Sequence, residues 1–185
     1  MSTTVTADPS SYLRGLLGPA VLLPWPTRSK GDRRRWKHLQ LADMNEANHL
    51  AKLERAGNIG VALGQVSNGL VTIDLDNDSQ ADSFLAANPL LRDTLQTRAS
   101  RGCNVWLRCA GDYPRSCNLI DQSGTKIGEL RGDGCQTIII GTHPSGVAYR
   151  FVVEKPVIKI RYDAIIWPDS IVAPHATESK RSRRE

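Results

Sequence analysis

Residues 70–76 read Leu70-Val71-Thr72-Ile73-Asp74-Leu75-Asp76, and this stretch decides the expected fold. Its branched apolar residues predict a β-strand. Side chains two apart in a strand point to the same face, so we expect Asp74 and Asp76 to lie side by side while Ile73 and Leu75 face the core. Neighbouring carboxylates repel each other unless a cation lies between them, and magnesium accepts one or two carboxylates. The pair therefore indicates a divalent-metal site, the alternative being two solvated acids at a strand end.

A second expected strand carries another acid beside a base. Residues 127–132 read Ile127-Gly128-Glu129-Leu130-Arg131-Gly132, which places Glu129 and Arg131 on one face. Two-metal phosphoryl transfer needs carboxylates from separate strands to bridge ions that are about 4 Å apart. The planar guanidinium of Arg131 suits a triphosphate, the alternative being a salt bridge that is worth little if exposed. The acids and this base together indicate metal-dependent phosphoryl chemistry.

The rest of the chain predicts a sheet with a few helices. Asn68-Gly69 lies between two β-rich runs and predicts a hairpin, and a further strand pair is expected around residues 132–134. Residues 110–126 are expected to form a loop. Because strands do not alternate strictly with helices, we expect a mixed sheet of the α+β kind. The expected strands lie at 20–23, 59–64, 70–76, 94–107, 126–131, 136–140 and 148–153, and the expected helices at 12–17, 43–55 and 77–91.

Charge favours an anionic partner. The chain has 185 residues, a net charge of +5 and a pI of about 9.2, and nucleic acid is the commonest partner of such proteins. Aromatic residues make up only 5%, which argues against a base-stacking platform. A basic, glycine-containing loop is expected to contact nucleic-acid phosphates, with an exposed tryptophan favouring this over a merely solvated charge run. Its candidate contacts are Lys30, Arg33, Arg34, Arg35, Trp36 and Lys37.

The chain is expected to form one domain at residues 11–172, between a leader at 1–10 and a basic tail or linker at 173–185. It contains no apolar run long enough for a membrane span and no signal-peptide pattern, so we expect a cytoplasmic protein without a membrane partner. No C-x-x-C pair is present, so we expect free thiols and no zinc site. The cysteines are Cys103, Cys109, Cys117 and Cys135.

At this point the sequence resembles the archaeo-eukaryotic primase superfamily, and within it the N-terminal domain of bifunctional primase–polymerases of plasmids, phages and prophages. Four ordered stretches between residues 15 and 155 carry the resemblance: the early strand with Lys30 and Trp36, residues 58–76, residues 97–107 and residues 128–149. The resemblance implies a primase–polymerase fold with an RNA-recognition-motif-like catalytic sheet and a small N-terminal α/β part. It also implies template-directed polymerisation of nucleotides with two magnesium or manganese ions.

The motifs assign roles residue by residue. Asp74 and Asp76 match the first metal motif, and Glu129, rather than nearby Asp133, matches a third acid that is usually Asp. Asn104 stands where the family keeps a His that contacts the incoming triphosphate, and it can still donate a hydrogen bond. Gly102 occupies a position that is usually small and polar. The nucleotide contacts implied in this way are Ser100, Arg101, Asn104, Arg131 and His143.

Three functions are open. The leading one is a DNA primase and/or DNA polymerase that acts in replication of a mobile element or phage. We expect it to be a monomer that binds a single-stranded DNA template, a primer, nucleoside triphosphates and a fused or separate helicase. The second is a catalytically weak or inactive primase-like module that binds nucleic acid and recruits a helicase, which the Asn104 and Gly102 departures favour. The third is a metal-dependent nuclease, since Asp74, Glu129 and Arg131 loosely imitate an acid–acid–base set.

Overall fold

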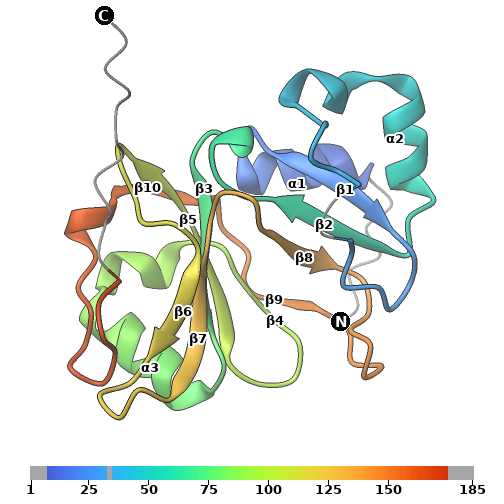
Figure 1. The fold of residues 1–185 in the computed structure, drawn as a ribbon. Helices are drawn as coiled ribbons and strands as arrows, with labels where there is room; N and C mark the ends of the chain where they lie inside the picture. Colours follow the sequence, from blue (N-terminus) through green and yellow to red (C-terminus); the bar gives the residue numbers. More distant parts are fainter. Residues whose placement is uncertain (1–7, 33–34, 175–185) are drawn as a thin grey trace, which may run out of the picture.

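Two β-sheets meet along the middle of the molecule (Figure 1). A computed structural model of the chain describes residues 8–32 and 35–174. The smaller, three-stranded sheet has the order β1-β2-β8, and its strands are antiparallel. These strands are β1 (Val21–Trp25), β2 (Asn58–Ala62) and β8 (Gln136–Ile140).

The larger sheet has seven strands in the order β6-β7-β3-β5-β4-β9, with β10 paired in parallel to the end of β5. Its centre is β3, which lies between β5 and β7 with both neighbours antiparallel. The strands are β3 (Leu70–Leu75), β4 (Gln96–Arg98), β5 (Cys103–Ala110), β6 (Cys117–Ile120), β7 (Lys126–Arg131), β9 (Arg150–Val153) and β10 (Ile158–Arg161). The α+β class expected from the sequence is confirmed.

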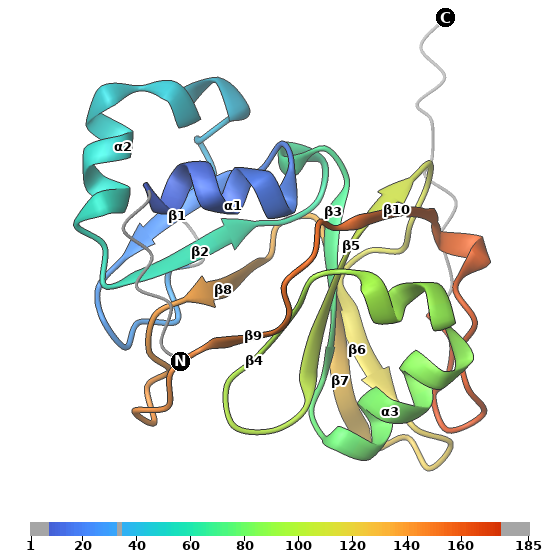
Figure 2. The ribbon, with the colours of Figure 1, turned by 180° about the vertical axis from the view of Figure 1, so that it is seen from behind.

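The helices divide between the sheets. The first two, α1 (Pro9–Leu17) and α2 (Ala47–Glu54), pack beside the smaller sheet, whereas α3 (Asp78–Ala87) covers one face of the larger sheet (Figure 2). Helix α1 begins where Asp8 accepts hydrogen bonds from two backbone N–H groups of the first turn. No helix among the described residues is long and apolar enough to cross a membrane.

The alternation expected for β3 is confirmed. Ile73 and Leu75 are buried against Phe84 of α3 in one core cluster. Thr72 and Asp74 point to the opposite face, where the Oγ1 atom of Thr72 lies 3.3 Å from the Oγ1 atom of Thr137 on β8. The face that carries Asp74 therefore looks towards the smaller sheet.

Both expected hairpins are wrong. Asn68 and Gly69 do form a turn with positive φ angles of 55° and 76°, but β2 and β3 then enter different sheets and are bridged only between Gly64 and Leu70. Strands β7 and β8 likewise separate after residues 132–134. In each case the turn chemistry sets the direction of the chain, while β3 and β7 find better partners in the larger sheet.

Other boundaries also differ from expectation. The expected loop at 110–126 contains the edge strand β6, and the strand expected within 94–107 corresponds to β5, with the short strand β4 before it. Helix α1 starts three residues before the expected residue 12. Asp43 and Asn45 do not cap α2 but belong to the 3-10 segment Leu41–Asn45 that precedes it. These short elements carry few apolar residues, so hydrophobic periodicity marks them poorly.

Candidate active site

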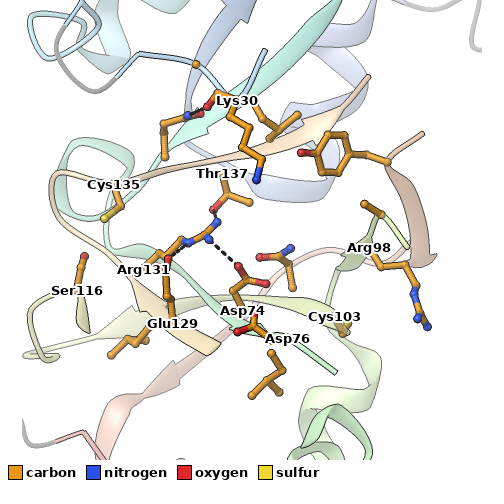
Figure 3. Close-up of a pocket in the computed structure, with 18 of the residues that line it drawn as sticks. Lys30, Asp74, Asp76, Arg98, Cys103, Ser116, Glu129, Arg131, Cys135 and Thr137 are labelled. Atoms are coloured by element: carbon orange, nitrogen blue, oxygen red, sulfur yellow. Dashed lines mark hydrogen bonds and ion pairs between the residues drawn. The ribbon is translucent and has the colours of Figure 1, made fainter. Parts of the chain in front are cut away.

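Three side chains form a row across the centre of the larger sheet. Asp74 on β3 is paired in register with Glu129 on β7 and with Asn104 on β5. Directly opposite residues in antiparallel strands point to the same face, so all three line one surface. Asp76 follows the end of β3 and lies next to Asp74 at the same face (Figure 3). The pairing expected for the acids from separate strands is thus present.

This surface forms one wall of a pocket of about 850 Å³. The larger sheet supplies the acids and the turn between β4 and β5, while the smaller sheet and its loops supply Lys30, Gln136, Thr137 and His143. The pocket therefore lies at the junction of the two sheets. All the residues expected to hold metal or nucleotide line it: Asp74, Asp76, Ser100, Arg101, Asn104, Glu129, Arg131 and His143.

Arg131 connects two of the acids. Its Nη2 atom lies 2.7 Å from Asp74 Oδ2, and its Nε atom lies 2.7 Å from Glu129 Oε2. A weaker contact of 3.5 Å joins Nη1 to Thr137 Oγ1 on β8. Lys126 Nζ takes the other oxygen of Glu129 at 2.5 Å. The salt bridge offered as one interpretation of Arg131 is therefore present. Because it lies inside the pocket, Arg131 is also placed where a triphosphate contact, the other interpretation, would be needed.

The acids differ in their electrostatics. Burial raises the pKa of Asp74, and the negative charges of Asp76 and Glu129 add to this effect against the attraction of Arg131. For Glu129, burial is outweighed by hydrogen bonds from Lys126 and Arg131, which lower its pKa. The two acids in turn outweigh burial and raise the pKa of Arg131. The negative charge of Asp74 is therefore only partly compensated by the guanidinium of Arg131, which Glu129 also contacts.

The donor set fits a divalent metal in one respect. Asp74 and Asp76 are neighbouring hard oxygen donors, and magnesium uses one or two carboxylates and completes its shell with water and phosphates. Within residues 8–32 and 35–174, no group of three or more acids, histidines or cysteines gathers closely enough to hold a metal alone. Glu129 has both oxygens occupied by basic side chains. Its role as third ligand stays a prediction that requires at least one of those contacts to open.

Asn104 brings an unused acceptor to the pocket. Its Oδ1 atom is buried and has no hydrogen-bond partner among the described residues. A buried acceptor without a partner is costly, and pockets that bind ligands are where such groups are tolerated. The amide can present either its oxygen or its nitrogen to a ligand after a flip, so it suits a phosphate, a sugar hydroxyl or a metal. Asn104 therefore keeps an acceptor without a partner at the position where the resemblance implies a histidine.

Two loops of the smaller sheet are fixed by one buried residue that the sequence did not reveal. Asn58 at the start of β2 donates from Nδ2 to the carbonyls of Ser29 and Thr142, at 2.9 and 2.8 Å, and accepts from the Thr142 N–H at 2.8 Å. These loops carry Lys30 and His143. A single asparagine at a strand end has no sequence pattern that indicates hydrogen bonds to the backbone of two loops. The sequence showed only that Asn58 directly precedes an expected strand.

His143 lines the pocket and also forms hydrogen bonds within its own turn. Its Nδ1 atom lies 2.7 Å from Ser145 Oγ and accepts from the Ser145 N–H, and its ring meets Tyr149 edge-on. Burial, followed by the charge of Lys30, lowers the pKa of His143. Both effects favour the neutral form of the ring in the free protein.

The described residues of the basic loop differ in burial and in whether they line the pocket. Trp36, expected to be exposed, is only 5% exposed and packs into the core, with its Nε1 donating to the carbonyl of Asp32 at 2.7 Å. The expectation of an exposed indole is wrong because the loop folds its ring inward and satisfies its N–H. Arg35 and Lys37 are exposed but do not line the pocket, whereas Lys30 does. Arg33 and Arg34 lie outside the described residues.

Further residues around the site were not expected. Arg98 lines the pocket and donates to Asp78 at 2.6 Å, and Asp78 also accepts the Gly102 N–H at 3.0 Å. These contacts hold the turn that carries Ser100 and Arg101. Asp133, the rejected third acid, is occupied elsewhere by Tyr113 and the backbone N–H of Gln65.

Comparison with known proteins gives the family. A family model described as the N-terminal domain of bifunctional DNA primase/polymerase matches residues 16–164, and this range includes every described candidate site residue. No curated protein shows significant similarity to the chain. The description of the family implies nucleotidyl transfer with DNA and nucleotides as substrates. The chain therefore belongs to the family of bifunctional DNA primase/polymerase N-terminal domains.

Proposed function

We propose that the chain is a template-directed nucleotidyltransferase, a DNA primase and/or DNA polymerase that adds nucleotides to a primer on single-stranded DNA. The observation that supports this best is the row of Glu129, Asp74 and Asn104 in a pocket lined by both sheets. The family background adds replication of a mobile element or phage, beside a helicase, as the setting.

Each side chain has a role in this proposal. Asp74 and Asp76 hold divalent ions, two of magnesium or manganese, and Glu129 joins them through Oε1 once Lys126 moves away. When bound, such ions neutralise the triphosphate and lower the pKa of the attacking primer hydroxyl. Ser100 and Arg101 are exposed at the turn between β4 and β5, where they reach phosphates without losing an internal partner. Lys30 faces the same space from the smaller sheet and attracts nucleic-acid phosphates.

The proposal is tested by primer extension with D74N and D76N variants in magnesium and in manganese. Loss of a metal ligand removes several kcal/mol of transition-state stabilisation, so we expect rates to fall about a hundredfold or more. D93N is the matched control, because Asp93 is exposed, pairs with Lys155 and does not line the pocket. Circular dichroism verifies that the variants fold. Undiminished extension by the double variant D74N/D76N contradicts the proposal.

Two observations favour a second function. Arg131 occupies Asp74, and Asn104 replaces the histidine of the family, as expected of a module that binds nucleic acid without polymerising. Salt-sensitive DNA binding that needs no metal, without incorporation of labelled nucleotide, would identify that module. The same assay on an unprimed template, with ribo- and deoxynucleotides in separate reactions, distinguishes priming from extension.

A further inference from the structure

The contact between Arg131 and Asp74 conflicts with the use of Asp74 as a metal ligand. The Nη2 atom of Arg131 lies 2.7 Å from Asp74 Oδ2, inside a pocket where the side chain of Asp74 is 18% exposed and that of Arg131 is 27% exposed. A divalent ion held by either oxygen of Asp74 would lie close to the guanidinium and be repelled by it. Metal binding at Asp74 is therefore weakened as long as the guanidinium of Arg131 stays on Oδ2.

The Nη groups of Arg131 can leave Asp74 while its Nε atom stays bound to Glu129. Its Nε atom is held by Glu129, which Lys126 fixes through its second oxygen. The Nη groups point into the pocket, and their second contact, to Thr137, is long at 3.5 Å. A guanidinium has five N–H donors in a fixed fork, so the Nη side can turn to a phosphate while Nε stays on Glu129. Figure 3 shows Arg131 between Asp74, Glu129 and Thr137, on the open side of the strands.

Charge makes the exchange favourable only when a nucleotide is present. Arg131 pairs with Asp74 and Glu129, Lys126 pairs with Glu129 alone, and Asp76 lies beside Asp74. Removing Arg131 alone therefore leaves the charge of Asp74 uncompensated at a partly buried site. A triphosphate offers Arg131 a bidentate partner of higher charge, and a divalent ion then offers Asp74 a replacement cation. Each ligand thus removes the obstacle to the other.

We propose that Arg131 passes from Asp74 to the triphosphate when a nucleotide binds, so that nucleotide and divalent metal bind cooperatively. The inference rests on the proposed function, since it requires that this pocket takes both ligands. Arg131 is a positioning residue for Asp74 in the free protein and a phosphate contact in the loaded one. Without nucleotide, the guanidinium keeps the metal site closed.

The test measures Mn²⁺ affinity by calorimetry or electron paramagnetic resonance, with and without a deoxynucleoside triphosphate analogue that carries an α,β-imido bridge. Because a triphosphate is itself a metal ligand, the informative quantity is how the coupling differs between wild type and R131Q. We expect R131Q to bind Mn²⁺ alone roughly tenfold more tightly than wild type and to lose a similar factor of coupling. R131K, which keeps the charge but not the fork, should lie between them.

R98Q is the matched control. It removes a positive charge from the same pocket, but Arg98 contacts Asp78 and not Asp74. A general electrostatic effect would tighten Mn²⁺ binding equally in R98Q and R131Q, and that result overturns the inference. So does an R131Q variant whose Mn²⁺ affinity and coupling equal those of wild type.

A measurement on the wild type covers the case in which R131Q does not fold. The ¹⁵N signals of the Arg131 guanidinium, assigned by comparison with R131K, should shift when the analogue is added in the presence of a metal chelator. Unchanged guanidinium signals at saturating analogue overturn the inference. Metal and nucleotide binding with full coupling but no polymerisation would refute the proposed function alone, and absence of both kinds of binding would refute both.

Discussion

Gly102 shows how strongly a single residue determines the site. Its φ angle is +67°, and a Cβ atom there would overlap the carbonyl oxygen of Leu75 at the end of β3. Its N–H is bound by Asp78. The resemblance implies a small polar residue at this position, and the close approach in this chain favours glycine. The positive φ angle and the nearby carbonyl together favour glycine in this turn.

The G102A substitution tests this explanation of the turn. We expect it to cost about 3 kcal/mol of unfolding free energy, because backbone strain is added to a steric overlap that only movement of β3 or the turn can relieve. Urea unfolding measures the loss. G124A is the control, since Gly124 has a similar φ of +82° but a Cβ atom there would meet nothing within 4 Å, and about 1 kcal/mol is expected. Equal losses in the two variants would show that Gly102 is needed only for its backbone angle.

At the scale of elements, the sequence predicted what local periodicity controls. The alternation along β3 placed Asp74 and Asp76 on one face and Ile73 and Leu75 in the core, and the structure confirms it. Strand partners were not predictable in the same way. The Asn68-Gly69 turn fits a hairpin, yet β3 pairs with strands that come later in the chain. Pairing depends on contacts distant in sequence, which a turn motif does not encode.

For the candidate site, too, some residues could be predicted from the sequence and others could not. The acids were predicted from their places on strands and the candidate nucleotide contacts mainly from the family resemblance, and all of them line the pocket. Trp36 was misplaced because its polar neighbours concealed a ring that packs beneath the loop. Asn58 was missed because a buried amide that binds backbone groups has no sequence signature. Burial and backbone contacts of single polar residues become visible only in three dimensions.

Asn58 leads to a prediction about two loops. In N58D, a carboxylate of nearly the same shape faces the carbonyls of Ser29 and Thr142 without donors, so we expect a loss of about 3 kcal/mol and faster hydrogen exchange at residues 27–31 and 141–149. Hydrogen exchange followed by mass spectrometry measures both loops at once. N48D on the exposed face of α2 is the control, with no change expected in either loop. Unchanged exchange in N58D would show that the loops hold their positions independently.

At the scale of the whole molecule, the pocket exists because two sheets keep a fixed relation. One core cluster crosses between them, joining Leu70 and Trp106 of the larger sheet to the side chains of β1 and β2. Arg108 on β5 adds a polar clamp. Its guanidinium donates to the carbonyls of Ser67 and Asn68 after β2, and to those of Leu17 and Pro19 before β1, at distances from 2.5 to 3.0 Å.

We expect this clamp to contribute to global stability and not only to local order. In R108Q, the shorter amide leaves several buried carbonyls without a donor, so the unfolding free energy should fall by about 3 kcal/mol. Because the apolar cluster still joins the sheets, tryptophan fluorescence and far-ultraviolet circular dichroism should report one coincident transition in urea. R55Q is the control: Arg55 also donates to a backbone carbonyl, that of Ala51, but on the surface, so a change below about 0.5 kcal/mol is expected. Two separate transitions in R108Q would mean that the guanidinium, rather than the shared core, holds the two sheets around the pocket.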